Sequence, residues 1–305
     1  MKTEKIEKQK VVCYGEVLWD VFPTKMKPGG APMNVAYHLQ KFGIESHMIS
    51  RVGDDESGKK LLNLLDGWNI PATDCQVDPI HETGKVEAIA DENNEMTYII
   101  HQPVAWDYIS QAPAYDKLVA EADAFVFGSL VTRNDTSRDT LYNLLEKAVY
   151  KVFDVNLRPP FYSMETVKYL LGNCNLLKLN HTELELISTW FNDHSGTEEE
   201  SVRFLQKEFD IDEVIVTKGS KGATYYTTTD SYSYPAFSVT VKDTVGSGDS
   251  FLAAFLAKKV QNKTPEEGMI YATALGAFVA AHEGACPSYD IAQIKDFQLQ
   301  HSPIF

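Results

Sequence analysis

Apolar and polar positions along the chain follow two alternating patterns, short apolar runs and longer stretches with helical spacing. Residues 10–16 form the first apolar run. Residues 32–43 follow, with a proline at the start, apolar residues at helical spacing and a glycine at the end. Residues 46–53 repeat the strand pattern, and residues 57–67 form an amphipathic stretch that also ends in glycine. The start of the chain therefore predicts strand, helix, strand and helix in that order.

The alternation continues through the middle of the chain. Buried strands are predicted at residues 124–128, 151–156, 175–180 and 213–219. Helical stretches separate them near residues 137–149, 182–189 and 198–208. Strands that alternate with helices predict an α/β fold, a mostly parallel sheet with helices on both faces. Because such sheets bind ligands beyond the carboxyl ends of their strands, we expect a site along that edge.

One region departs from this alternation. Residues 84–102 contain two β-rich runs separated by the turn-forming residues DENN, which predicts a hairpin in a thin sheet with one covered face. No linker rich in glycine or serine and no internal repeat divides the sequence. We therefore expect residues 1–305 to form one domain, which carries a small β-sheet lid made of residues near 16–30 and 74–107.

Composition and charge exclude several classes of function. The 305 residues include 43 acidic and 28 basic side chains, for a net charge of −15, which argues against nucleic acid as a partner. No apolar run reaches membrane-spanning length, and the one near the N-terminus is too short for a signal peptide. The four cysteines are scattered singly and form no C-x-x-C pair. Free thiols in a chain without an export signal predict a cytoplasmic protein.

The stretch DTVGSGDSF at residues 243–251 carries the most distinctive chemistry. Gly246 and Gly248 allow successive backbone amides to point at one anion at the start of a helix. Asp249 then has two interpretations of equal weight. It caps the helix that follows, or it accepts a proton from a hydroxyl while a phosphoryl group arrives.

Two further segments suit a ligand rich in hydroxyl groups. In PGGAPMNVA at residues 28–36, Gly29 and Gly30 let the backbone approach a ligand, and Asn34 offers donors and acceptors. Asp20 is an acid within an otherwise apolar run. Taken singly, the glycines also fit a turn at the start of a helix, and Asp20 fits a surface edge.

Two segments suit a nucleotide and its metal. Asn180 and Glu183 lie three residues apart where a strand passes into a helix, a spacing that suits magnesium held through water. By itself, the segment is explained better by helix capping through Asn180 or Thr182. The glycine-rich turn VTKGSKGA at residues 216–223 suits the edge of a nucleotide.

Together, and in this order, these segments resemble the ribokinase-like (PfkB) family of sugar kinases over almost the whole length. DTVGSGD is the most diagnostic of the family's motifs, and Ser247 replaces its common alanine. Residues 127–141 and 153–162 look like bacterial fructokinases. The resemblance implies a large α/β domain with a small β lid over the sugar, and ATP and magnesium as co-substrate and cofactor.

The resemblance also assigns roles to residues. It makes Asp249 the general base and Gly246, Ser247 and Gly248 the anion hole. It places the sugar against Asp20, Gly29, Gly30, Asn34 and Asp249, with Arg158 facing the sugar or the phosphates. It places the nucleotide near Asn180, Thr217, Gly219, Gly222 and Gly248, with Asn180 and Glu183 serving magnesium.

The family often holds potassium beside the anion hole and often dimerises through its lids. The resemblance implies that Asp243 and Ser288 offer side-chain oxygens to such an ion, with the carbonyls of Val245, Val279, His282 and Gly284 around it. The alternative is that Asp243 only braces the loop by hydrogen bonds. A homodimer through the lid is expected in addition.

The best overall interpretation is a fructokinase that phosphorylates the 6-hydroxyl of fructose with ATP. A sister kinase for ribose, 2-keto-3-deoxygluconate or another small sugar is the first alternative. A sugar-binding protein without turnover is the alternative from another class, against which the retained Asp249 and its glycines argue. A phosphofructokinase is disfavoured because no basic cluster lies near the sugar motifs.

Overall fold

The computed structural model describes residues 8–90, 96–191 and 196–301. Within them, nine strands form one large sheet in the order β13-β12-β11-β10-β9-β8-β1-β4-β5. Their bounds are β1 Lys10–Tyr14, β4 Glu45–Gly53, β5 Cys75–Asp78, β8 Ala124–Gly128, β9 Lys151–Asp154, β10 Leu176–Asn180, β11 Glu213–Thr217, β12 Ala223–Tyr226 and β13 Ser231–Tyr234. In this spatial order, all neighbouring strands between β11 and β5 pair in parallel. β12 and β13 pair antiparallel at the other end of the sheet. The predicted mostly parallel sheet is confirmed.

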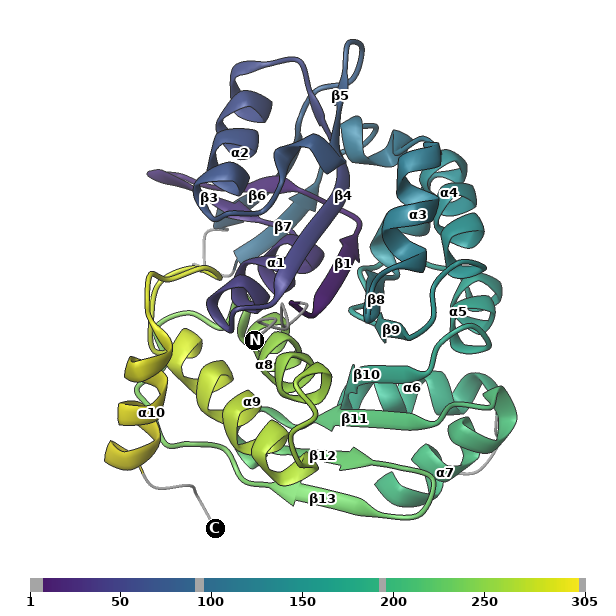
Figure 1. Ribbon diagram of the computed structural model, residues 1–305, viewed down its shortest axis with the longest axis vertical. Helices are drawn as coiled ribbons and strands as arrows, with labels where there is room; N and C mark the ends of the chain where they lie inside the picture. The colour runs from purple at the N-terminus through teal and green to yellow at the C-terminus, as the bar shows by residue number, and fades with distance from the viewer. Residues whose placement is uncertain (1–7, 91–95, 192–195, 302–305) are drawn as a thin grey trace, which may run out of the picture.

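Helices cover both faces of this sheet, as predicted (Figure 1). One face packs against α1 Ala31–Lys41, α2 Glu56–Gly67, α8 Ser247–Val260, α9 Pro265–Ala280 and α10 Ile291–Gln300. The other face packs against α3 Pro113–Ala120, α4 Asp135–Leu145, α5 Met164–Leu171, α6 His181–Phe191 and α7 Glu198–Phe209. In β1, Val11 and Cys13 join the first core, whereas Val12 and Tyr14 join the second. This alternation explains why central strands read as continuous apolar runs.

A second, smaller sheet stands apart from the large one. Its order is β3-β2-β6-β7, made of β2 Leu18–Phe22, β3 Lys25–Gly29, β6 Gly84–Ala90 and β7 Met96–Ile100. β2 pairs antiparallel with β3 and parallel with β6, and β6 and β7 form the predicted hairpin. The turn at residues 91–94 lies outside the described residues. The sheet is narrower than the expected range 74–107, because β5 pairs with β4 in the large sheet.

Short 3-10 helices connect these elements. They are η1 Ala72–Asp74, η2 Ala105–Tyr108, η3 Leu130–Arg133 and η4 Gly219–Lys221. Across the described ranges, no helix has both the length and the apolar character needed to cross a membrane.

The α8 helix is buried on all sides, which fixes the site at its N-terminus. Residues 250–258 are all buried, and α9 and α1 pack against the helix. A helix that is apolar all round belongs in the core of a protein. The packing of residues 250–258 therefore fixes the position of the first turn of α8.

Candidate active site

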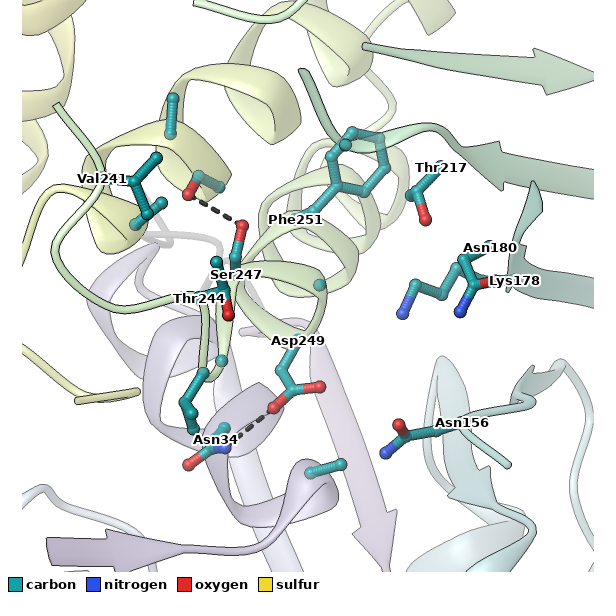
Figure 2. A pocket seen from close by; sticks show the side chains of 18 of the residues that line it. Asn34, Asn156, Lys178, Asn180, Thr217, Val241, Thr244, Ser247, Asp249 and Phe251 are labelled. Carbon is teal, nitrogen blue, oxygen red and sulfur yellow. Dashed lines mark hydrogen bonds between the residues drawn. The ribbon is translucent and has the colours of Figure 1, made fainter. Parts of the chain in front are cut away.

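A cavity of about 900 Å³ opens between the carboxyl edge of the large sheet and the small sheet. Its walls come from β2, β6 and β7 of the small sheet, the ends of β10 and β11, and the N-termini of α1 and α8. Figure 2 shows side chains from these elements converging on one space. The volume suits a ligand of nucleotide or sugar size, and the position is the one that the sheet topology predicts.

Asp249 lies in the first turn of α8 and does not cap the helix. The N-cap residue is Gly246, with φ of 76°, and no side chain makes a capping hydrogen bond there. The Asp249 carboxylate instead accepts a hydrogen bond from the Asn34 amide nitrogen at 2.8 Å (Figure 2). Of the two interpretations of this residue, the helix cap is therefore excluded by the geometry.

The surroundings of Asp249 make its carboxyl group a weaker acid than that of an exposed aspartate. Burial raises the pKa of its carboxyl to about 6, and the nearby Asp154 carboxylate acts in the same direction. Lys178, the Asn34 hydrogen bond and Arg158 oppose the shift. A carboxyl group with a pKa close to neutrality is suited to accept and release a proton.

The first turn of α8 presents backbone amides to the cavity. The Ser247 amide donates to the Thr244 carbonyl at 3.3 Å, whereas the described residues supply no acceptor for the amides of Gly248 and Asp249. The Ser247 hydroxyl donates to the Gly276 carbonyl of α9 at 3.0 Å. Serine in place of the family's alanine is therefore accommodated by a bond to the neighbouring helix. Amides at a helix N-terminus form a favourable site for a phosphate group.

A loop near the C-terminus supports this turn. A Cβ on Gly246 would overlap Ala285, so the two backbones are packed as closely as glycine permits. The His38 ring of α1 bonds the Ala285 carbonyl at 2.9 Å and the Tyr289 hydroxyl at 2.8 Å. Burial lowers the pKa of His38 to about 4, which keeps the ring neutral. Helix α1 thus fixes both Asn34 and the loop beneath the anion hole.

The residues expected at the sugar lie together at one end of the cavity. Asp20, Gly30, Asn34 and Arg158 line it. Gly29 does not line it, because the space that its Cβ would fill holds the Asp20 carboxylate. Burial, with the charge of Asp249 next, raises the pKa of Asp20 to about 6. Glycine at position 29 therefore makes room for Asp20.

Asn180 and Glu183 form a reciprocal helix cap. The Asn180 side-chain oxygen accepts from the Glu183 amide at 2.9 Å, and the Glu183 carboxylate accepts from the amides of Asn180 at 2.8 Å and Leu157 at 2.9 Å. This is a capping box at the start of α6. Asn180 lines the cavity and Glu183 does not. With both carboxylate oxygens bonded to amides, Glu183 serves as a cap here, and its role toward magnesium stays a prediction.

The residues expected near the nucleotide occupy the other end of the cavity. Thr217, Gly219 and Gly222 line it. An apolar wall completes this end, and no sequence motif predicted it. Its side chains come from α8, α9 and the segment before the anion hole, and include Val239, Val241, Phe251, Ala277 and Ala280. Scattered apolar residues from separate elements carry no local pattern, so only the fold brings them together.

Some of the residues expected around potassium contact Asp243. Its carboxylate accepts from the amides of Val245 at 3.1 Å and Gly284 at 3.0 Å. The Val279 carbonyl accepts from the His282 amide at 2.9 Å, and Ser288 is exposed. The Lys27 ammonium of β3 also lies 3.5 Å from Asp243. Asp243 therefore braces the loop, and a cation is already beside it.

Several polar residues in this region were not predicted, among them Glu16, Asp154, Asn156 and Lys178. Burial raises the pKa of Glu16 to about 7, and its carboxylate accepts from the Ala31 amide at 3.3 Å. Asp154 and Lys178 pair at 2.9 Å at the ends of β9 and β10. The signal that could have revealed this pair is a charged residue at or near the end of each of two neighbouring buried strands.

Comparison with known proteins extends this description. The pattern of the pfkB family carbohydrate kinases matches residues 3–292. Probable fructokinase-6, chloroplastic, of Arabidopsis thaliana is 26% identical over 309 aligned residues, which cover 91% of this chain and 79% of the relative. Fructokinase-2 of Zea mays is 26% identical over 308 aligned residues, which cover 91% of this chain and 90% of the relative.

Solved structures share the fold. Fructokinase from Vibrio cholerae O395, with fructose, ADP and calcium bound, superposes with a TM-score of 0.82 at 24% identity, covering 95% of this chain and 99% of that one. A double mutant of that enzyme binds fructose, ADP and potassium. A putative ribokinase II from E. coli, with ATP and magnesium, has a TM-score of 0.85 at 20% identity, covering 97% and 100%. Since the family pattern spans nearly the whole sequence, the chain belongs to the pfkB family of carbohydrate kinases.

Proposed function

We propose that this carbohydrate kinase is a fructokinase, which transfers the γ-phosphoryl group of ATP to the 6-hydroxyl of fructose. The observation that carries the proposal is the placement of Asp249, with a raised pKa, between Asn34 and the first amides of α8. The fructokinase names of the relatives support fructose as the substrate.

The transfer follows from the arrangement of the site. The Asp249 carboxylate accepts the hydroxyl proton of the sugar. The sugar oxygen forms a bond to the γ-phosphorus while the bond from that phosphorus to the bridging oxygen breaks, and ADP leaves with the electron pair. The amides of Gly248 and Asp249 stabilise charge on the phosphoryl oxygens. Magnesium, when bound, would neutralise phosphate charge near Asn180.

The charges at the sugar end favour a neutral sugar. Glu16, Asp20 and Asp249 place three carboxyl groups there, against the guanidinium of Arg158, while the nearby Lys178 ammonium is already paired with Asp154. A sugar acid or a sugar phosphate would bring its own negative charge next to these groups. This arrangement favours fructose or ribose over 2-keto-3-deoxygluconate.

A panel of free sugars with ATP tests the proposal. ADP release is followed with fructose, ribose, 2-keto-3-deoxygluconate and fructose 6-phosphate, and the product is located by NMR. Fructose should show the highest kcat/KM and yield the 6-phosphate. A higher kcat/KM for another sugar would replace fructose, and sugar binding without any ADP release would point to a binding protein.

Three further features belong to the same proposal. Potassium would sit beside Asp243, where it would compete with the Lys27 ammonium. Equal turnover in potassium chloride and in choline chloride would refute the potassium site. The four free cysteines suit a reducing cytoplasm. A homodimer through the small sheet would cover the apolar side chains exposed on its outer face.

A further inference from the structure

Lys178 is an unusual residue for its position. It lies in β10, a central strand of the large sheet, and only 7% of its surface is exposed. Its ammonium pairs with both oxygens of Asp154, at 2.9 and 3.1 Å, and Asp154 is its register partner on β9. Burial disfavours the charge on Lys178, but Asp154 and Asp249 more than offset this, so the pKa of the ammonium is raised. The lysine is therefore a fixed positive charge.

This charge lies against the anion hole. A Cβ placed on Gly248 would be 3.1 Å from the Lys178 nitrogen, which is closer than a lysine could tolerate without moving. Lys178 also lines the cavity, and Figure 2 shows its ammonium pointing into that space beside Asn180. Glycine at position 248 thus leaves room for the ammonium at the place where backbone amides face the cavity.

The pairing leaves the ammonium able to bind a ligand. An ammonium carries three donors, and one carboxylate on one side cannot align with all of them. A pair that served stability alone has no need to face a cavity, and such buried pairs contribute little to stability on balance. The position at the carboxyl edge of the sheet is where ligands of this fold class bind.

We propose that Lys178 is a further catalytic residue, whose ammonium donates a hydrogen bond to a non-bridging oxygen of the transferring phosphoryl group, and that Asp154 is its positioning residue. The lysine keeps its proton throughout, so the transfer described above is balanced without it. Its charge opposes the negative charge that spreads over the phosphoryl oxygens in the transition state. The inference rests on the proposed phosphoryl transfer and adds a charged side-chain donor to the backbone amides of the anion hole.

The test removes the charge without leaving a buried partner unpaired. Lys178→Met alone would strand Asp154 in the interior and destabilise the fold. The double variant Lys178→Met/Asp154→Asn removes both charges at similar volume. The matched control is Lys258→Met/Glu267→Gln, because Lys258 is as buried as Lys178 but pairs with Glu267 away from the cavity. Melting temperature is measured for all of them.

The expected result is a loss in the chemical step and not in nucleotide binding. The double variant should lose roughly 10²–10³-fold in kcat, as for a removed oxyanion-hole donor, with KM for ATP changed by less than about threefold. Ethylamine should restore part of the kcat of Lys178→Ala/Asp154→Asn, in which no buried carboxylate is left unpaired. The control pair should keep its kcat. A kcat of the double variant within about threefold of the wild type would overturn the proposal.

A binding measurement separates this inference from the proposed function. Calorimetry compares magnesium-ADP alone with magnesium-ADP plus aluminium fluoride, which mimics the phosphoryl group in transfer. The double variant should lose the tighter binding of the mimic and retain that of ADP. If the wild type turns over no sugar of the panel, the proposed function fails. The role of Lys178 is then decided by the binding of the aluminium fluoride mimic alone. Equal binding of the mimic by wild type and variant would reject the role of Lys178.

Discussion

Residue 249 shows how a side chain acquires a chemical role from its neighbours. The motif DTVGSGD is equally compatible with a cap and a base, because both place an acid at the start of a helix. The structure separates them, since the carboxylate bonds to Asn34, 215 residues away in the sequence, and not to the amides of its own helix. The role of the residue therefore depends on a contact that no local pattern contains.

Asp249→Asn should remove the base and preserve the fold. The amide keeps the size of the side chain and cannot accept the hydroxyl proton. Turnover should therefore fall roughly 10²–10⁴-fold, the usual contribution of a general base. Steady-state kinetics with fructose measures the loss, and fructose binding by calorimetry serves as the control. Turnover close to wild type in a folded variant would refute the assignment.

The same variant should be more stable than wild type at alkaline pH. The pKa of Asp249 is raised from 3.8 to about 6 on folding, so the folded state binds this proton more tightly than the unfolded state. Its effect on stability is a penalty that appears as pH rises from 4 to 6 and is complete above 6. The shift corresponds to at most about 3 kcal/mol. The melting temperature of Asp249→Asn should exceed that of the wild type at pH 8 but not at pH 4.

The pH dependence of wild-type catalysis should show the same group. Because the base works as the carboxylate, kcat/KM should fall about tenfold per unit below a pKa close to 6 and level off above it. Asp20 and Glu16 titrate nearby, at about 6 and 7, so the apparent value belongs to the group of three. The residual kcat/KM of Asp249→Asn should not fall in this way at acidic pH. If the fall persists in the variant, it reports the titration of another residue.

Gly246 is required for its conformation and for its contact. Its φ of 76° disfavours any side chain, and a Cβ there would overlap Ala285. Gly246→Ala should therefore move the anion-hole amides and lower kcat/KM by about 10²-fold, as small misplacements do. The control is Gly43→Ala, which has a similar φ of 78° with open space around it. An equal loss of activity in both variants would show that backbone strain, and not the contact with Ala285, lowers the activity.

At the scale of elements, the hydrophobic pattern predicts the central strands and several of the helices, but it missed α3, α5, α9 and α10. The strand expected at 124–128 forms with those bounds, and the helix expected at 198–208 extends by one residue. These segments are buried on a whole face, so their pattern is strong. β5, β12 and β13 were not predicted as strands. They are four residues each, and β5 and β13 form the two edges of the sheet with β12 next to β13, where alternation is weak and neighbours decide.

The site follows the same rule at this scale. Glycine motifs and polar residues at strand ends were predicted from the sequence, because their chemistry is visible locally. Lys178 and Asp154 were missed, because each appears in the sequence as one residue of a buried strand. Only the register of β9 against β10 makes them a pair.

The hairpin of β6 and β7 should act as a lid over the sugar. Val86, Tyr98 and Ile100 line the cavity from this sheet, so closure would exclude water from the phosphoryl group. Replacing residues 85–100 by a short glycine linker should raise ATP hydrolysis relative to sugar phosphorylation, or abolish fructose binding. ADP release is compared with sugar phosphate formed. An unchanged ratio and unchanged fructose binding would reject the lid.

At the scale of the molecule, the small sheet has two faces with different surroundings. The register places Asp20 and Val86 opposite each other on the face that lines the cavity. The next row, Met26, Val21, Glu87 and Ile99, points to the other face, where Val21 also packs against the first core. Met26 is 49% exposed and Ile99 44%. A thin sheet with apolar residues on its outer face favours a covering partner.

A second copy of this chain would provide that cover by placing outer face against outer face. Wild type should then sediment with the mass of two chains. Ile99→Asp should sediment as one chain, because a second carboxylate directly opposite Glu87 would add a like charge to the contact. Ile80→Asp is the control, since Ile80 is 83% exposed and lies outside the small sheet. A wild type that sediments as one chain at all concentrations, or an Ile99→Asp dimer, would refute this arrangement. If the dimer forms, the lid of each copy is braced by the other, and the monomeric variant should also lose fructose affinity while retaining that for ATP.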